Sequence, residues 1–249
     1  MIDMKNPETG RLYEALKLLE ANLAGTVDRD ELAQEILDFL AMAAGLKPVF
    51  LLGRGLDSPR WVDCAAGLAA EFGFHVVRGI FWDATPFDKF PRWYRDYTVA
   101  QFGALRSVYV CSSAETATEI NAINEAGGRL SMSTEARLLG YPECCVAAHY
   151  DSAGRYHQAI LSIVKRLAGG DRTQMQALLR SGVPLFPKTP RESANMEALF
   201  LLDPASFGSW NQCQSCAEDD HSPSAKLSEK YRALAETTDV ELLRTLSRD

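Results

Sequence analysis

Four of the six cysteines fall into two tight pairs, an arrangement that suits metal binding or thiol chemistry. The first pair is Cys144-Cys145, and the second pair, Cys213 and Cys216, has the spacing C-x-x-C. Two thiol pairs that lie far apart in a sequence can close a four-sulfur site around a metal ion or an iron–sulfur cluster. The sequence therefore predicts a metal centre built by these four cysteines.

The spacing also indicates which metal to expect. Directly adjacent cysteines strain a site for one small ion, since two neighbouring side chains must turn back onto it. A [4Fe–4S] cluster offers a separate iron atom to each sulfur, so it accommodates adjacent ligands more easily. We therefore expect a [4Fe–4S] cluster as the cofactor, with zinc as the alternative.

The first pair follows a proline that is well placed to begin a helix. Pro142 would put Cys144 and Cys145 in the first helical turn. The unpaired backbone N–H groups there favour a thiolate and should lower its pKa. His149 lies four residues after Cys145 and would share its face of the helix. Cys144, Cys145 and His149 are therefore the candidate catalytic residues, although the sequence names no reaction.

Two other functions fit the same cysteines. In a metal-free thiol redox or sulfur-transfer protein, Cys144 or Cys145 would attack and the later pair would resolve the mixed disulfide. In a non-catalytic interaction module, a structural zinc ion would only staple the C-terminal region. The remaining cysteines, Cys64 and Cys111, are expected to be buried structural thiols.

The segment around the first pair reads Leu138-Leu139-Gly140-Tyr141-Pro142-Glu143-Cys144-Cys145, and the C-x-x-C and a serine-bearing helix follow far downstream. In these features the chain resembles a sparsely characterised prokaryotic family of unknown function. The resemblance covers the second half of the chain and carries over Gly140, Tyr141, Pro142, Cys144, Cys145, Cys213 and Cys216. The chain departs from the family at Asn211-Gln212, where a histidine and a proline tend to precede the later pair. The resemblance implies no reaction.

Composition and charge limit the class of protein. The 249 residues are 47% hydrophobic and 24% charged, which is typical of globular proteins, and the formal charge is -7. An acidic chain repels phosphate backbones and anionic lipid, so no nucleic-acid partner is expected. We find no signal peptide and no apolar run long enough to span a membrane. We therefore expect a cytoplasmic protein that acts on a small molecule.

Hydrophobic periodicity and capping residues predict an α/β fold in three parts. Residues 1–45 should form a helical pair packed on the core, residues 46–140 an α/β domain, and residues 141–249 a mainly helical region with the cysteine pairs. In the second part, strands at 48–52, 74–81 and 107–111 alternate with helices. This order predicts a small three-layer domain with a parallel sheet.

The loops after two of these strands offer candidate substrate contacts. Arg54 and Asp57 follow the first strand, and Ser112 and Ser113 follow the third. Because the carboxyl ends of parallel strands meet at one edge, these four side chains are expected to share a ligand site there. The aromatic segment 87–97 is expected to be a crossover helix that packs on the sheet.

The last hundred residues show helical character and little sign of strands. Helices are expected at 156–167, 173–179, 222–235 and 239–246. The stretch 183–210 contains four prolines, so we expect it to be irregular and to carry the second cysteine pair back toward the first.

Overall fold

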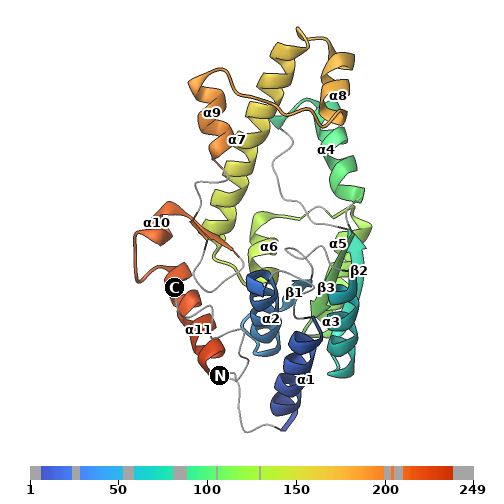
Figure 1. Cartoon of the computed structure of the whole chain (residues 1–249), viewed down its shortest axis with the longest axis vertical. Coiled ribbons are helices and arrows are strands. Elements are labelled where there is room, and N and C mark those ends of the chain that lie inside the picture. Colours follow the sequence, from blue (N-terminus) through green and yellow to red (C-terminus); the bar gives the residue numbers. More distant parts are fainter. Residues whose placement is uncertain are drawn as a thin grey trace.

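The computed structural model describes residues 7–23, 29–52, 59–80, 89–104, 106–128, 130–198, 203–204 and 210–237. Helices predominate around one three-stranded sheet, and a second, two-stranded sheet lies in the C-terminal part. Figure 1 shows an elongated molecule, with the larger sheet in its lower half and a bundle of helices that extends away from it. We call the part around the larger sheet the body. We call the helical extension, which includes residues 92–104, 172–180 and 190–197, the arm.

The larger sheet is antiparallel, and the predicted parallel sheet is wrong. Strands β1 (Val49–Leu52) and β2 (His75–Ile80) both pair with β3 (Arg106–Cys111), which lies between them and runs in the opposite direction. Val49 and His75 both lie opposite Cys111. Strands β1 and β2 therefore run in the same direction, as a βαβ unit requires, but they are not neighbours.

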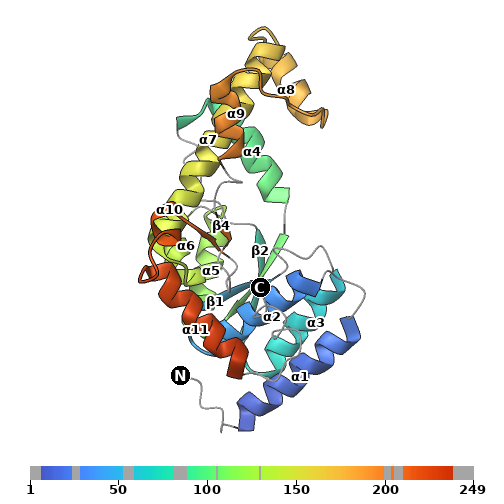
Figure 2. The ribbon, with the colours of Figure 1, turned by 60° about the vertical axis from the view of Figure 1, so that its left-hand side comes forward.

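The parallel prediction failed because the helix after β2 does not cross back over the sheet. This helix, α4 (Arg92–Ala104), lies in the arm (Figure 2). Its Tyr94 packs there with the preceding Phe90 against Ile160, in a cluster separate from the main core. The chain therefore returns to the sheet at the end where β2 finished, and β3 runs back beside β2.

Two helices precede the sheet, as their leucine spacing predicts. Helix α1 (Pro7–Leu23) buries Leu12 and Leu16, and helix α2 (Arg29–Ala43) buries an almost continuous stretch from Leu32 to Met42. All four residues of β1 are buried. Helix α3 (Pro59–Glu71) follows β1 and packs Trp61, Ala65 and Ala69 into the same core.

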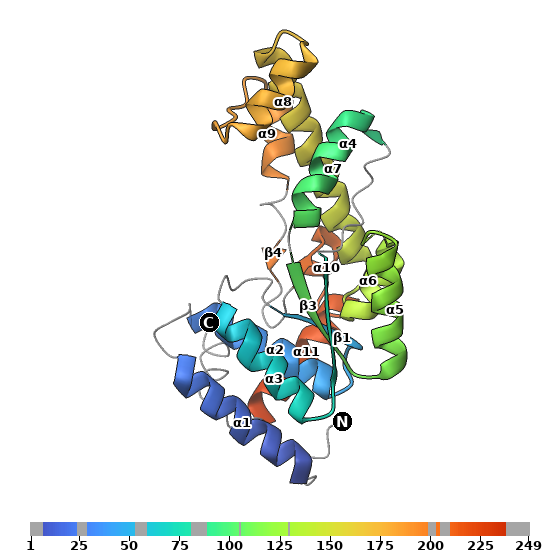
Figure 3. The same cartoon turned by 90° about the vertical axis from the view of Figure 1, so that its right-hand side faces the viewer.

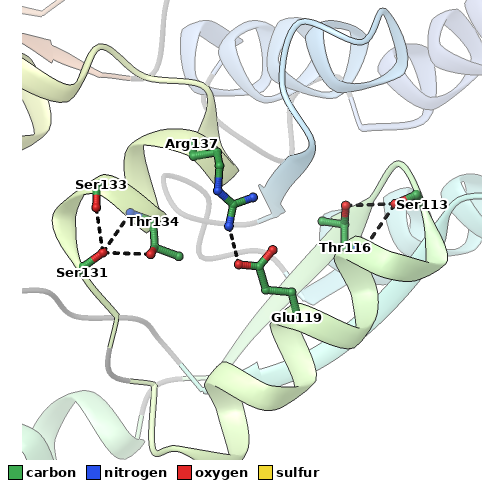
Figure 4. Close-up of polar contacts among 7 residues, drawn as sticks. All are labelled: Ser113, Thr116, Glu119, Ser131, Ser133, Thr134 and Arg137. Carbon is green, nitrogen blue, oxygen red and sulfur yellow. Dashed lines mark hydrogen bonds and ion pairs between the residues drawn. The ribbon is translucent and has the colours of Figure 1, made fainter.

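Polar caps fix the two helices that follow β3 (Figure 4). Helix α5 (Ala114–Glu125) follows Ser113, which is its N-cap and accepts from the Thr116 backbone N–H. Ser131 caps α6 (Met132–Leu139) in the same way. Arg137 on α6 donates to Glu119 on α5, so the two helices are held together on the exposed side of the body.

A single long helix joins the body to the arm. Helix α7 (Glu143–Leu167) has 25 residues, which corresponds to roughly 37 Å. Its far half carries α8 (Arg172–Arg180) and α9 (Pro190–Glu197), and Figure 3 shows them beyond the end of the body. Helix α9 lies in the stretch predicted to be irregular, where Thr189 and Glu192 form a capping box around Pro190.

The C-terminal part returns to the body. Strands β4 (Asp203–Pro204) and β5 (Asn211–Gln212) form the two-stranded sheet, which the sequence did not predict. The short helix α10 (Gln214–Ala217) and helix α11 (Pro223–Thr237) follow, while the helix predicted at 239–246 lies outside the described residues.

The main core includes residues from α1, the sheet, α7 and α11. The predicted division at residues 45 and 140 and the three-layer arrangement stay predictions. Among the described helices, none combines the length and apolar character that a membrane span requires.

Candidate metal centre

A tight turn between α6 and α7 presents the first cysteine pair. Gly140 ends α6 in the left-handed conformation, with φ of 71°, and Pro142 caps α7 with φ of -59°. The Cys145 backbone N–H donates to the Pro142 carbonyl over 2.9 Å, so the helix is already formed at the pair. Cys144 and Cys145 therefore occupy the first turn of α7, as predicted.

The second pair lies on the turn from β5 into α10. Cys213 is the N-cap of α10, and the Cys216 backbone N–H donates to the Cys213 carbonyl over 2.9 Å. This turn brings both sulfurs to one side. The Cys213 backbone N–H also donates to the Cys145 sulfur over 3.4 Å, which connects the two segments directly.

The four sulfur atoms lie together. The Cys144 and Cys216 sulfurs are 3.5 Å apart, the Cys145 and Cys213 sulfurs are 3.8 Å apart, and all four lie within 4.8 Å of one another. Three of the thiols are buried, and Cys144 is exposed. The predicted convergence of two remote cysteine pairs is thus confirmed, and the four thiols could hold a metal.

Protonation differs among the thiols. Burial is the main reason that the pKa of Cys144 rises to about 11, and it also raises the pKa of Cys145. The predicted lowering by the helix N-terminus is therefore wrong for this pair. Burial acts in the same direction on Cys213, but hydrogen bonds with Ser215 and Cys216 outweigh it and lower the pKa of Cys213 to about 7. A metal that binds here must displace protons from the first pair.

A cluster of three aromatic rings adjoins the centre. Trp210 lies between Tyr141 and Tyr231, with ring centroids 5.6 Å and 5.4 Å away respectively. The Trp210 indole N–H donates to Ser224 on α11 over 2.8 Å. This aromatic cluster therefore holds together the turn before α7, the start of β5 and helix α11.

A buried ion pair lies next to this aromatic cluster. The Lys47 ammonium is 2.7 Å from the Asp38 carboxylate, and the Tyr231 hydroxyl donates to the same oxygen over 3.2 Å. The Lys47 ammonium also lies 5.5 Å from the centroid of the Tyr141 ring. Burial and the Asp38 charge raise the pKa of Tyr231, so its hydroxyl keeps the proton that it donates. The sequence did not predict this group of residues, because no pattern in it indicates that the three elements meet.

A small cavity of about 40 Å³ adjoins the centre, and Cys145 forms part of its wall. His149, one turn after Cys145, also lines the cavity, so the two residues share a face of α7 as predicted. The other lining residues with polar or aromatic groups are Glu135, Tyr141, Tyr150, Trp210 and Asn211. Glu135 was not among the predicted site residues, although it falls on a short capped helix directly before the cysteine turn.

The carboxyl ends of β1 and β3, which the predicted substrate contacts follow in sequence, do not meet at one edge of the sheet. Because β3 is antiparallel to β1, Ser112 lies beside the start of β1, where its backbone N–H donates to the Pro48 carbonyl over 2.9 Å. Ser113 caps α5, and Arg54 and Asp57 lie outside the described residues. The reason for grouping these four residues is therefore wrong, and contact of each with a substrate stays a prediction.

The two other cysteines lie outside the cluster. Cys111 is buried in the sheet, as predicted, and burial raises its pKa to about 12. Cys64 is exposed on α3, so the expectation that it is buried is wrong. Its exposure makes it a suitable control for experiments on the four clustered thiols.

Comparison of the sequence with protein-family models, curated proteins and solved structures yields no significant match. The resemblance carried by residues 138–145 and by the later C-x-x-C therefore stays a prediction. The case for a function depends on the geometry of the site.

Proposed function

We propose that this protein binds one zinc ion through Cys144, Cys145, Cys213 and Cys216, and that the ion fastens β5 and α10 to the start of α7. The observation that carries the proposal is the spacing of the four sulfurs, all within 4.8 Å of one another. Zn–S bonds of about 2.3 Å in a tetrahedron place neighbouring sulfurs roughly 3.8 Å apart. The distances of 3.5 and 3.8 Å between segments agree with this value.

The same spacing reverses the order of preference between zinc and a [4Fe–4S] cluster. Thiolates around a four-iron cluster bind four different iron atoms, so they must stand farther apart than thiolates around a single ion. The two adjacent cysteines meet the spacing that a single ion requires, since each lies against a sulfur of the other segment and all four sulfurs are within 4.8 Å of one another.

A closed set of four thiolates is the arrangement of structural zinc sites, whereas catalytic zinc keeps one position for water or substrate. This supports the stapling function over a catalytic role for the metal. All six cysteines are free thiols, which fits the reducing cytoplasm as the compartment.

Thiol exchange is the second candidate function, and the lowered pKa of Cys213 favours it. A nucleophilic thiolate must also reach its substrate. Cys213 is only 7% exposed, and the exposed Cys144 has a raised pKa. The acidic thiol and the accessible thiol are thus different residues, so the geometry supports metal binding over exchange.

The test is the metal content of protein purified anaerobically, for the wild type and for the variants Cys144→Ser, Cys213→Ser and Cys64→Ser. We expect about one zinc ion per chain in the wild type and in Cys64→Ser, and a large loss in the other two variants. Both losses are required because each variant removes a ligand from a different segment.

The other outcomes separate the alternatives. Stoichiometric iron with broad visible absorption would show that the same thiols hold an iron–sulfur cluster, and it would overturn the zinc proposal. Metal-free protein with four reactive thiols would favour exchange chemistry. Metal loss in only one of the two ligand variants would overturn the shared site.

A further inference from the structure

The cavity beside the metal centre has the composition of a binding site in its own right. It is lined by residues of α6, the first two turns of α7 and the start of β5. Its volume of about 40 Å³ is room for about three to four water-sized groups, since one such group needs roughly 10–15 Å³. A ligand that fits must therefore be small.

The cavity combines a buried acid with aromatic walls. Glu135 is 6% exposed, and the Tyr150 hydroxyl donates to its carboxylate. The rings of Tyr141 and Trp210 are both buried, and their planes are inclined by 33°. A carboxylate attracts a cation by charge, and aromatic faces attract it through their quadrupole.

We propose that this cavity binds a small organic ammonium ion of up to about four non-hydrogen atoms, with Glu135 as its charge partner. The aromatic rings contact the carbon atoms and the flank of the cation. His149 and Asn211, both half-buried, line the cavity and offer polar atoms for a hydroxyl or a second amine. The proposal does not depend on which metal the cysteines bind.

The charge of the molecule favours a cationic ligand. The chain carries a formal charge of -7, so its overall field attracts cations. Lys47 lies over the ring of Tyr141, which lines the cavity. Its ammonium is 2.7 Å from Asp38, and this carboxylate offsets its charge. Lys47 therefore opposes a bound ammonium ion only weakly.

The first experiment compares two probes on the metal-loaded wild-type protein by ligand-observed NMR titration. Ethanolamine is a cation at neutral pH, and ethylene glycol is a neutral molecule with the same number of non-hydrogen atoms. We expect saturable binding of ethanolamine at about millimolar Kd and binding of ethylene glycol at least ~10-fold weaker. Equal binding of the two probes, or no saturable binding of ethanolamine, would overturn the proposal.

The second experiment uses variants whose folding is checked by circular dichroism. Glu135→Gln removes the charge but keeps the shape, so ethanolamine should bind at least ~10-fold more weakly. Glu125→Gln removes an exposed charge at the end of α5, so it should leave the affinity unchanged. Unchanged affinity in a folded Glu135→Gln variant would remove Glu135 as the charge partner and overturn the proposal.

Tyr150→Phe covers the case in which Glu135→Gln fails to fold. It removes the hydroxyl that donates to Glu135 but keeps the ring and the carboxylate, so ethanolamine binding should persist within about threefold. Loss of binding in folded Tyr150→Phe would contradict a site whose main attraction is the Glu135 charge.

Metal content is measured on every sample, which separates this proposal from the zinc proposal. Zinc-loaded protein that does not bind ethanolamine would overturn the ammonium site alone. Protein that binds ethanolamine selectively but holds no metal would overturn the zinc site alone.

Discussion

At the residue scale, Glu192 shows how one buried carboxylate can hold several segments of the arm. It caps its own helix, accepts from the Lys188 backbone N–H over 2.8 Å and from the Ser162 hydroxyl over 2.9 Å, and pairs with Arg166 at 3.3 Å. These contacts with α7 and with the loop before α9 favour the ionised form. They lower the pKa of Glu192 to about 2, the largest contribution being the hydrogen bond from the Lys188 backbone.

A native pKa below the ordinary value of 4.5 means that ionised Glu192 stabilises the fold above about pH 4.5. The stabilisation is lost as the pH falls from about 4.5 to about 2. We predict that Glu192→Gln unfolds at a lower urea concentration at pH 7, and that its stability changes less than that of the wild type across this acidic window. Urea unfolding followed by circular dichroism at several pH values measures both effects.

The matched control for this prediction is Glu197→Gln, at the exposed end of the same helix. It removes the same charge without the buried contacts, so its pH profile should follow that of the wild type. If Glu192→Gln and the wild type lose the same stability between pH 4.5 and 2, ionisation of Glu192 does not hold the arm.

At the element scale, the turn between α6 and α7 fixes the position of the first cysteine pair. A Cβ atom added at Gly140 would lie 2.6 Å from the Lys47 Cβ and 3.3 Å from the Lys47 Cα. The backbone there has φ of 71°, which costs a non-glycine residue about 1–2 kcal/mol. The site thus depends on a glycine both for the backbone conformation and for the close approach.

We predict that Gly140→Ala destabilises the protein by more than Gly45→Ala. Gly45 has φ of 73° and nothing within 4 Å of an added Cβ, so its substitution measures the backbone cost alone, about 1–2 kcal/mol. Gly140→Ala should cost a further 1–3 kcal/mol, roughly the penalty for overpacking, and should lower the metal content. Urea unfolding and elemental analysis measure the two effects, and equal midpoints for the two variants would contradict the role of the close approach.

The elements also show what the sequence could predict. The leucine spacing of α1 and α2 and the apolar run of β1 are local patterns. The structure confirms the two helices and the strand that these patterns predicted. Strand pairing is not local, because it depended on α4 joining the arm rather than the sheet. The start of α9 could have been predicted, since Thr189, Pro190 and Glu192 have the spacing of a capped helix start. The surrounding prolines led instead to the prediction of an irregular stretch.

The candidate site likewise has a part that the sequence predicted and a part that it did not. The cysteine types and spacing predicted which four thiols meet, because a metal site demands a full set of ligands. The cavity beside them and the pair Lys47–Asp38 depend on contacts among elements distant in sequence, and no local pattern encodes such contacts. Burial likewise decided the pKa of Cys144 and Cys145 against the effect of the helix N-terminus.

At the scale of the whole molecule, the metal centre lies at one end of α7 and the helices of the arm at the other (Figure 1). The two cysteine pairs are separated in sequence by the rest of α7 and by α8 and α9. A metal bound by both pairs closes this long loop near its base. Its removal should therefore loosen the β5–α10 segment first, while the arm keeps its own apolar clusters.

We predict that removing the metal with a chelator lowers the thermal stability of the wild type. With free zinc at 100 to 1,000 times its Kd, binding contributes about 3–4 kcal/mol. For a chain of this size, that corresponds to a shift in Tm of roughly 6–16 °C. Cys64→Ser should show the same shift, and Cys144→Ser, which lacks a ligand, should show little.

Hydrogen exchange on the same two states locates the effect. Without metal, amide exchange should rise in residues 210–217, where the Cys213 and Cys216 backbone N–H groups lie in the turn that presents the sulfurs. Residues 172–180 of α8 should exchange at the same rate in both states, because their apolar contacts with α7 do not involve the metal centre. Faster exchange throughout the arm, or an unchanged Tm in protein shown to have lost its metal, would contradict a local staple between β5–α10 and the start of α7.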